Sequence, residues 1–145
     1  MQSPPAKPSA LVKPTLDTRF HIDYSWWERG GEDLRTYLLS HLSPEQRERL
    51  MLQGESRTLD YIDPETGEIS RLDELQMAIR NAAQDPDFIN PHTSVVDSIF
   101  RVFLANDNRP LSSREIAEYV GRPASVILKT LSGGRIYKGI RPTET

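Results

Sequence analysis

Three histidines and a group of carboxylates are the side chains in this sequence that could do chemistry. His21 and Asp23 stand two residues apart in a segment of alternating apolar residues, so an extended strand would place both on one face. A histidine beside a carboxylate could serve a hydrolytic or metal site. However, His21, His41 and His92 are far apart and lack the spacing of metal ligands. We therefore interpret His21 and Asp23 as part of the polar side of a strand.

Other signatures of catalysis are missing from the sequence. The segment 60–68, DYIDPETGE, holds four carboxylates, but it lacks the ligand order of an EF-hand, and its proline and glycine are typical of a turn. No serine lies in a G-x-S-x-G elbow, and no phosphate-binding loop or dinucleotide motif occurs. Without cysteine there is no thiol nucleophile, disulfide or thiolate metal site. We predict that the protein is not an enzyme, with no catalytic residue, metal or cofactor.

The distribution of charge indicates binding rather than catalysis. The formal net charge is −3, but it is uneven. Residues 1–91 contain 10 Lys and Arg against 16 Asp and Glu, whereas residues 92–145 contain 8 against 5. An acidic first part joined to a basic last part suggests two modules with different partners.

Size and composition are those of an ordinary globular protein. The chain has 145 residues, 37% of them apolar, which suits one domain or two small ones sharing a core. Its first residues, MQSPPAKPSALVKP, lack the long apolar core of a secretory signal, and no stretch approaches the roughly 18 apolar residues of a membrane helix. We expect a cytoplasmic protein without a membrane partner.

The first part of the chain is expected to begin with a tail and a short extended segment. Residues 1–16 contain four prolines and few apolar residues, which predicts a flexible tail. Alternating apolar residues from Phe20 to Trp26 predict an extended segment. Its adjacent Trp26 and Trp27 would face opposite ways, so one of them would be core and the other a candidate protein-interaction residue.

Helices and a hairpin are expected to follow. Leucines four residues apart between 34 and 42 predict one helix, and Ser43 with Gln46 forms a capping box for the next. Strands near Thr58–Ile62 and Glu68–Leu72 would flank a turn, and a further helix would cover residues 72–84.

Three helices are expected in the last third of the chain. Thr93 is a suitable N-cap for the most apolar helix, SVVDSIFRVFLAN. Ser112 and Glu115 form a capping box for the second helix, which would end at Gly121. Pro123 would begin the third helix, and two glycines would end it. Short strands are then expected at Arg135–Tyr137 and Ile140–Pro142.

This last third resembles the winged helix-turn-helix superfamily of bacterial regulators. The resemblance covers about residues 93–142 and is carried by apolar or small residues at helix-pair spacing, namely Ile116, Ala117, Val120, Gly121, Ile127 and Leu131. In that family the second helix of the pair enters the major groove of DNA, and the helix ends and the wing hold phosphates.

The resemblance implies two groups of DNA-binding residues. On the recognition helix, RPASVILKTLSG, the outward residues are Arg122, Ser125, Val126 and Lys129. The cations that would contact phosphates are Arg114, Arg135, Lys138 and Arg141.

The sequence therefore predicts a mainly helical α+β protein. A tail (1–16) precedes an acidic helical region with a β-hairpin (17–91), and a C-terminal winged-helix domain (92–145) has three helices plus a minimal wing. We expect a small DNA-binding protein, a transcriptional regulator whose partner is duplex DNA. The alternative is a non-enzymatic adaptor or subunit of a larger assembly that uses the winged helix for protein–protein contacts. Both interpretations leave room for a homodimer.

Overall fold

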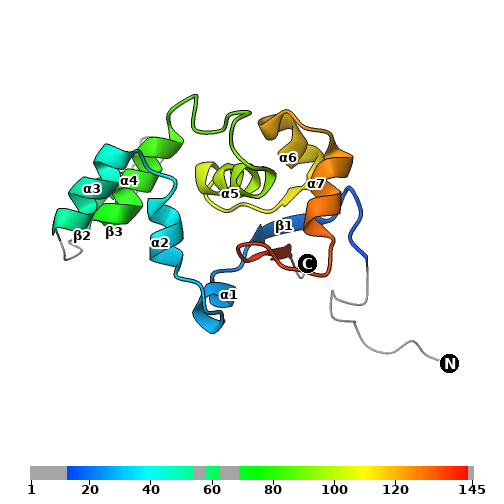
Figure 1. Ribbon diagram of the computed structural model, residues 1–145, viewed down its shortest axis with the longest axis horizontal. Helices are drawn as coiled ribbons and strands as arrows, with labels where there is room; N and C mark the ends of the chain where they lie inside the picture. Colours follow the sequence, from blue (N-terminus) through cyan, green and yellow to red (C-terminus); the bar gives the residue numbers. More distant parts are fainter. Residues whose placement is uncertain (1–12, 54–57, 63–68, 144–145) are drawn as a thin grey trace. The chain divides into compact units, whose positions relative to one another are not determined.

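The computed structural model describes residues 13–53, 58–62 and 69–143 and shows an α+β protein (Figure 1). The described residues form seven helices and five strands. In chain order they are β1 (Arg19–Ile22), α1 (Tyr24–Arg29), α2 (Leu34–Leu39), α3 (Pro44–Gln53), β2 (Thr58–Ile62), β3 (Ile69–Asp73), α4 (Glu74–Ala83), α5 (Val95–Ala105), β4 (Leu111–Ser112), α6 (Ser113–Val120), α7 (Ala124–Leu131) and β5 (Ile140–Pro142). Within the described ranges no helix has the length and apolar character needed to cross a membrane.

The chain divides into two compact units. Unit 1 combines Met1–Gly30 with Ile89–Thr145, and unit 2 is the continuous segment Gly31–Phe88. The break at Phe88 lies in the proline-containing loop after α4. The first break differs from the expected division at residues 16 and 17, because β1 and α1 belong with the C-terminal elements rather than with the acidic region.

A three-stranded antiparallel sheet joins the two ends of unit 1. Its strand order is β4-β1-β5, so the strand nearest the start of the described chain is central. Phe20 pairs with Leu111 of β4 on one side and with Pro142 of β5 on the other. Phe20 is fully buried, and Ile22 is only 1% exposed.

Helix α5 contributes four buried apolar side chains to the core of unit 1. Ser94 caps it by accepting a hydrogen bond from the Asp97 N–H, so the N-cap is one residue later than the predicted Thr93. Ile99, Phe100 and Phe103 are completely buried. Figure 1 shows α5 beside α6 and α7, the two helices with which it packs.

The side chain of Asn108 continues the hydrogen bonding of β1 where β4 stops. Its Oδ1 accepts from the Ile22 N–H at 2.7 Å, and its Nδ2 donates to the Ile22 carbonyl at 2.9 Å. Asp107 and Asn108 have φ of 62° and 59°, a conformation that Asn and Asp tolerate better than most residues. The Asn108 side chain thus makes the two hydrogen bonds to Ile22 that a backbone residue of a neighbouring strand would otherwise make.

The expected extended segment from Phe20 to Trp26 is only half extended. β1 ends at Ile22 because the Asp23 carboxylate accepts a hydrogen bond from the Ser25 N–H and caps α1. Tyr24 and both tryptophans therefore lie on a helix, and Asp23 is a helix cap rather than a strand residue.

Unit 2 contains helices α2, α3 and α4 and the antiparallel hairpin β2–β3. The predicted capping box is present: the Gln46 N–H donates to Ser43 Oγ at 3.2 Å, and the Ser43 N–H donates to the Gln46 side chain at 3.3 Å. The hairpin register pairs Leu59 with Leu72, and β3 is placed one residue later than the predicted strand Glu68–Leu72. The expected turn at residues 63–67 lies outside the described residues.

Candidate nucleic-acid interface

Helix α6 begins and ends where the sequence predicted. Ser112 Oγ accepts from the Glu115 N–H at 3.2 Å, and the Ser112 N–H donates to the Glu115 carboxylate at 2.9 Å, which completes a capping box. At the other end Gly121 has φ of 70° and donates to the Ala117 carbonyl at 2.9 Å. This left-handed conformation turns the chain sharply into α7 and favours glycine.

Helix α7 has one buried face and one exposed face. Ile127 is fully buried and Leu131 is 9% exposed, so both point into unit 1 as predicted. Ser125, Val126 and Lys129 are exposed on the opposite side of the helix, and Val126 is 39% exposed. The helix thus presents three of the four expected recognition residues to solvent.

Arg122, the fourth of these residues, is held inside unit 1. Its Nη2 donates to the carbonyl oxygen of Thr93 at 3.0 Å, which fastens the turn between α6 and α7 to the start of α5. Arg122 is half-buried, so its guanidinium group positions the helix pair and does not extend into solvent.

The four expected phosphate-contacting cations also differ in their surroundings. Arg135 is exposed, with its guanidinium 5.4 Å from the ring centroid of Tyr137. Arg114 on α6 is exposed and donates to Asp17 at 3.0 Å. Such a surface ion pair is weak and can exchange for another anion.

Lys138 lies in the turn before β5 and Arg141 on β5 itself, and both side chains reach α1 or its N-cap. The Lys138 Nζ lies 6.0 Å from the ring of Trp27, and Arg141 Nη1 donates to Asp23 Oδ2 at 3.0 Å. Their positive charges are therefore partly engaged within unit 1.

The turn before β5 replaces the expected small hairpin. The predicted strand at Arg135–Tyr137 is wrong: these residues are not a strand, and β5 pairs with β1 instead. The Ile140 N–H donates to the Tyr137 carbonyl at 3.0 Å, and both central residues, Lys138 and Gly139, have positive φ. Two positive φ values are characteristic of a type I′ turn, here with lysine in the first position.

Helix α1 and its N-cap hold this turn in place by donating hydrogen bonds to two carbonyls of the turn. The Asp23 N–H donates to the Gly139 carbonyl at 2.7 Å, and Trp27 Nε1 donates to the Lys138 carbonyl at 3.0 Å. A side chain at Gly139 would place its Cβ 3.0 Å from both the Asp23 carbonyl oxygen and Trp27 Nε1. Only glycine fits this close approach.

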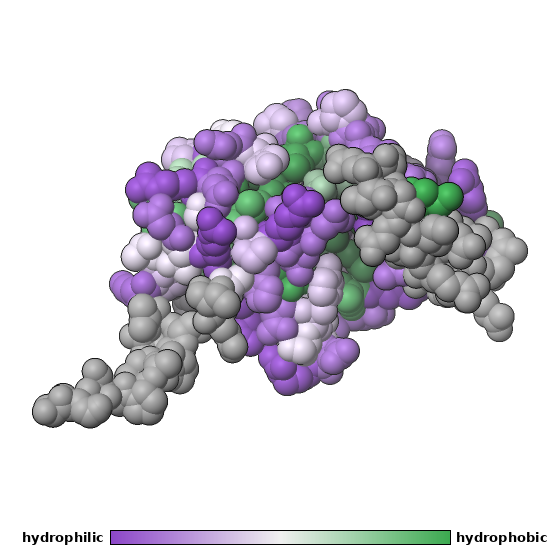
Figure 2. Space-filling model, turned by 180° about the vertical axis from the view of Figure 1, so that it is seen from behind, coloured by the Kyte–Doolittle hydropathy of each residue, from purple (hydrophilic) through white to green (hydrophobic). Residues whose placement is uncertain are grey.

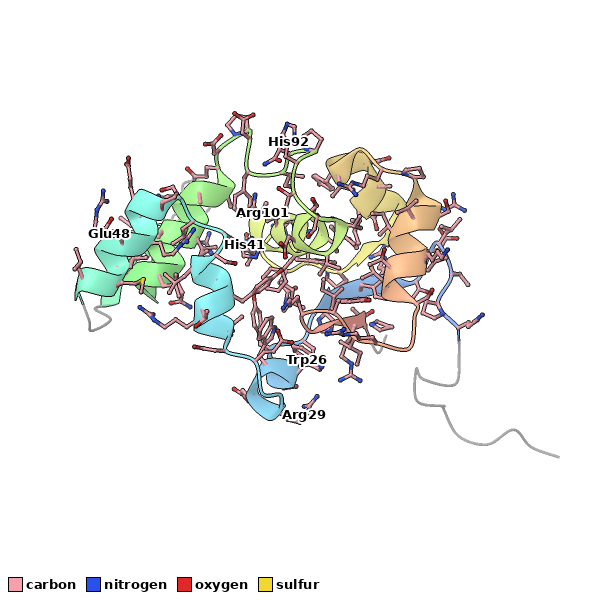
Figure 3. All side chains as sticks on the ribbon, in the orientation of Figure 1. Trp26, Arg29, His41, Glu48, His92 and Arg101 are labelled. Atoms are coloured by element: carbon pink, nitrogen blue, oxygen red, sulfur yellow. The ribbon has the colours of Figure 1, made fainter. Side chains whose placement is uncertain are left out.

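The two tryptophans have different roles. Trp27 is 4% exposed and packs edge-on against Phe100, with ring centroids 6.2 Å apart. Trp26 is half-buried and lies edge-on to Trp27 at 5.2 Å. Figure 3 labels Trp26 and Arg29 on α1. One tryptophan is in the core, as expected. The two side chains point in different directions because they are neighbours on a helix, and not because they alternate on a strand.

Asp23 has several partners in unit 1. The Ser25 hydroxyl donates to Asp23 Oδ1 at 2.6 Å and is the main reason that the pKa of Asp23 lies below its ordinary value. The Ser25 N–H and the charges of Arg141 and Arg29 lower this pKa further, while partial burial opposes them. Asp23 thus stays ionised and fixes Arg141.

Charge separates the two units more clearly than the expected division at residue 92. Unit 1 contains 12 Lys and Arg against 8 Asp and Glu, a balance of +4, and unit 2 contains 6 against 13, a balance of −7. Between Glu118 and Glu144 the sequence has five cations and no acidic residue. The surface visible in Figure 2 is mostly hydrophilic.

The three histidines lie on separate parts of the chain. His21 lies on β1, His92 precedes α5, and the buried His41 belongs to unit 2; Figure 3 labels the last two. In the part of the chain that the structure describes, no group of three or more His, Cys, Asp or Glu side chains is placed to hold a metal ion.

No family model matches the sequence, and no curated protein or solved structure is significantly similar to it.

Sequence reasoning missed Asn108 and the supporting role of Asp23. Asp23 followed by Ser25 is a recognisable N-cap signal that the alternating pattern concealed. The Asn-Asp-Asn run at 106–108 indicates a turn, but its bonds to a residue 86 positions away leave no local signal.

Proposed function

We propose that unit 1 is a variant winged helix-turn-helix that binds duplex DNA with α7 in the major groove. The observation that carries this proposal is the exposed face of α7, where Ser125, Val126 and Lys129 stand together within a stretch of 25 residues that has cations and no acids. In this variant β1 takes the sheet position of a wing strand, and the turn at 137–140 is the remnant of the wing.

The dimensions and chemistry of α7 suit this role. The major groove is about 12 Å wide and admits one α-helix. Lys129 is exposed on the outer face, and among the described residues no hydrogen bond or ion pair holds its ammonium group. Lys129 and Arg135 would supply the contacts to phosphate, while Arg122 would position the helix.

Duplex binding at two salt concentrations tests the proposal. The full chain is compared with a Lys129→Glu/Arg135→Glu variant by fluorescence anisotropy on a random-sequence duplex. Each phosphate contact contributes about 0.9 to the slope of log affinity against log salt, so losing two should reduce the slope by about 1.8. We expect wild-type binding at low salt that weakens steeply as salt rises.

The matched control reverses the same number of charges in unit 2. Arg35 and Arg49 are exposed there, and an Arg35→Glu/Arg49→Glu variant has the same net charge as the test variant. It should bind like wild type. Equal loss in both variants would indicate a general charge effect, and no wild-type binding at low salt would refute the proposal.

Exposed apolar side chains around the helix pair favour a second candidate, a protein-binding adaptor. Tyr119 on α6 is 56% exposed, and Val126 and Ile136 are each 39% exposed. Tyrosine is enriched among the residues that dominate protein interfaces, and exposed apolar patches mark interaction sites. This candidate expects no salt-dependent DNA binding, so the same titration separates the two functions.

A further inference from the structure

The exposed face of α7 contains an apolar residue where a polar one would be usual. Val126 is 39% exposed and lies between the exposed polar residues Ser125 and Lys129. It also lies in the first turn of α7, after the N-cap Pro123. In helix-turn-helix proteins the N-terminal residues of the recognition helix contact the base edges.

The neighbours of Val126 limit which groups on this face can read bases. The Thr130 hydroxyl donates to the Val126 carbonyl at 3.0 Å, and Arg122 is bound to the Thr93 carbonyl. Ser125 and Lys129 therefore remain as polar readers, and Val126 is the apolar one. A β-branched side chain has little rotamer freedom in a helix, so its methyl groups are already positioned.

Only one apolar group lies on the base edges of the major groove, namely the 5-methyl group of thymine. We propose that Val126 contacts this methyl group, so that the preferred duplex has a thymine facing the first turn of α7. The inference rests on the proposed function. It deepens that function by naming a residue that selects sequence rather than one that holds phosphate.

Replacing thymidine by deoxyuridine tests the contact, because the two differ only in the 5-methyl group. A duplex is enriched from a random-sequence pool by the full chain, and each thymidine is then replaced in turn. Burial of one methyl-sized group corresponds to about a fourfold change in affinity. We expect about fourfold weaker wild-type binding at one or two positions.

Substitutions of Val126 show whether this residue senses the methyl group. Val126→Ser should bind the thymidine and deoxyuridine duplexes equally, and Val126→Thr, which keeps one methyl, should retain part of the difference. Because Val126 is exposed, the thermal unfolding midpoint should not change. Met51→Ser removes an exposed apolar side chain from unit 2 and should leave the difference intact.

Three results separate failure of this inference from failure of the proposed function. If no position is sensitive to deoxyuridine, or if Val126→Ser keeps the same sensitivity, the methyl contact is refuted while DNA binding stands. If the pool is bound at low salt but no duplex is enriched, α7 does not read bases and the inference is again refuted. If nothing is bound at low salt, both proposals fail.

Discussion

Unit 1 and unit 2 differ in the sequence separation of the segments that pack together in them. Unit 1 is built from two segments separated by the whole of unit 2, and its central strand β1 pairs with β4 and β5 from the far end of the chain. Unit 2 is continuous, and its hairpin β2–β3 is formed by neighbouring strands. The unit that carries the candidate interface therefore depends on distant contacts, whereas the acidic unit depends on local ones.

The difference explains why the cations of unit 1 cannot be judged from a local pattern. Arg141 donates a hydrogen bond to Asp23, which is 118 residues away in the sequence. The carbonyl oxygen of Lys138 accepts a hydrogen bond from Trp27, which is 111 residues away. The packing of β1 and α1 against the turn before β5 and β5 itself therefore determines which cations of unit 1 remain available to bind a partner. Lys129 and Arg135 lie outside these contacts and carry the proposed phosphate binding.

The largest expected effect comes from removing the central side chain of β1. Phe20→Ala leaves a cavity in a fully buried position and should lower the free energy of unfolding of unit 1 by about 3–5 kcal/mol. Both tryptophans of the chain lie in unit 1, so the urea dependence of their fluorescence follows that unit.

An equivalent core truncation in unit 2 shows whether the two units unfold separately. Ile79→Ala removes a side chain that is 7% exposed and should cost about 2–5 kcal/mol in unit 2. Far-ultraviolet circular dichroism should report the loss, while the tryptophan transition should stay unchanged. If Ile79→Ala shifts that transition as strongly as Phe20→Ala, the two units unfold together and the comparison is wrong.

A smaller effect is expected where α1 meets the turn before β5. Gly139→Ala forces an alanine to φ of 77° and places its Cβ 3.0 Å from the Asp23 carbonyl and Trp27 Nε1, so it should destabilise unit 1 by about 1–3 kcal/mol. Gly134→Ala is the matched control, since an added Cβ there meets nothing within 4 Å. Equal midpoints for both variants in urea would contradict the close packing of the turn.

Much of the helix pair could be predicted from sequence because its signals are local. The capping box at Ser112, the turn at Gly121 and the buried pair Ile127 and Leu131 are each set by neighbours in the chain. The partner of β5 could not be predicted in this way. Nothing within residues 135–142 indicates that the strand joins β1 rather than its own neighbour.

Asn108 offers a test of comparable size on the other side of the sheet. Asn108→Asp keeps an acceptor for the Ile22 N–H but loses the donor to the Ile22 carbonyl, which should cost about 1–2 kcal/mol. Asn108→Ala removes both bonds and should cost more. Urea unfolding followed by tryptophan fluorescence measures the order, and an aspartate variant as stable as wild type would contradict the role of the side-chain amide.

The smallest expected effect is the pH dependence due to Asp23. Because folding lowers the pKa of Asp23, its contribution is fully present above the ordinary aspartate pKa and is lost as pH falls through the lowered value. Asp23→Asn should therefore reduce stability by no more than about 1 kcal/mol at neutral pH, since the pairs are partly exposed. The difference from wild type should shrink below about pH 4. A constant difference across this range would exclude ionisation as its cause.

The central position of β1 also orders events during synthesis. β1 emerges from the ribosome before either of its neighbours, and its last partner, β5, follows only after the whole of unit 2. Domains fold as units while the chain is made at about 5–20 residues per second. The acidic unit can therefore be complete before β1 has paired, and the sheet of unit 1 is assembled last.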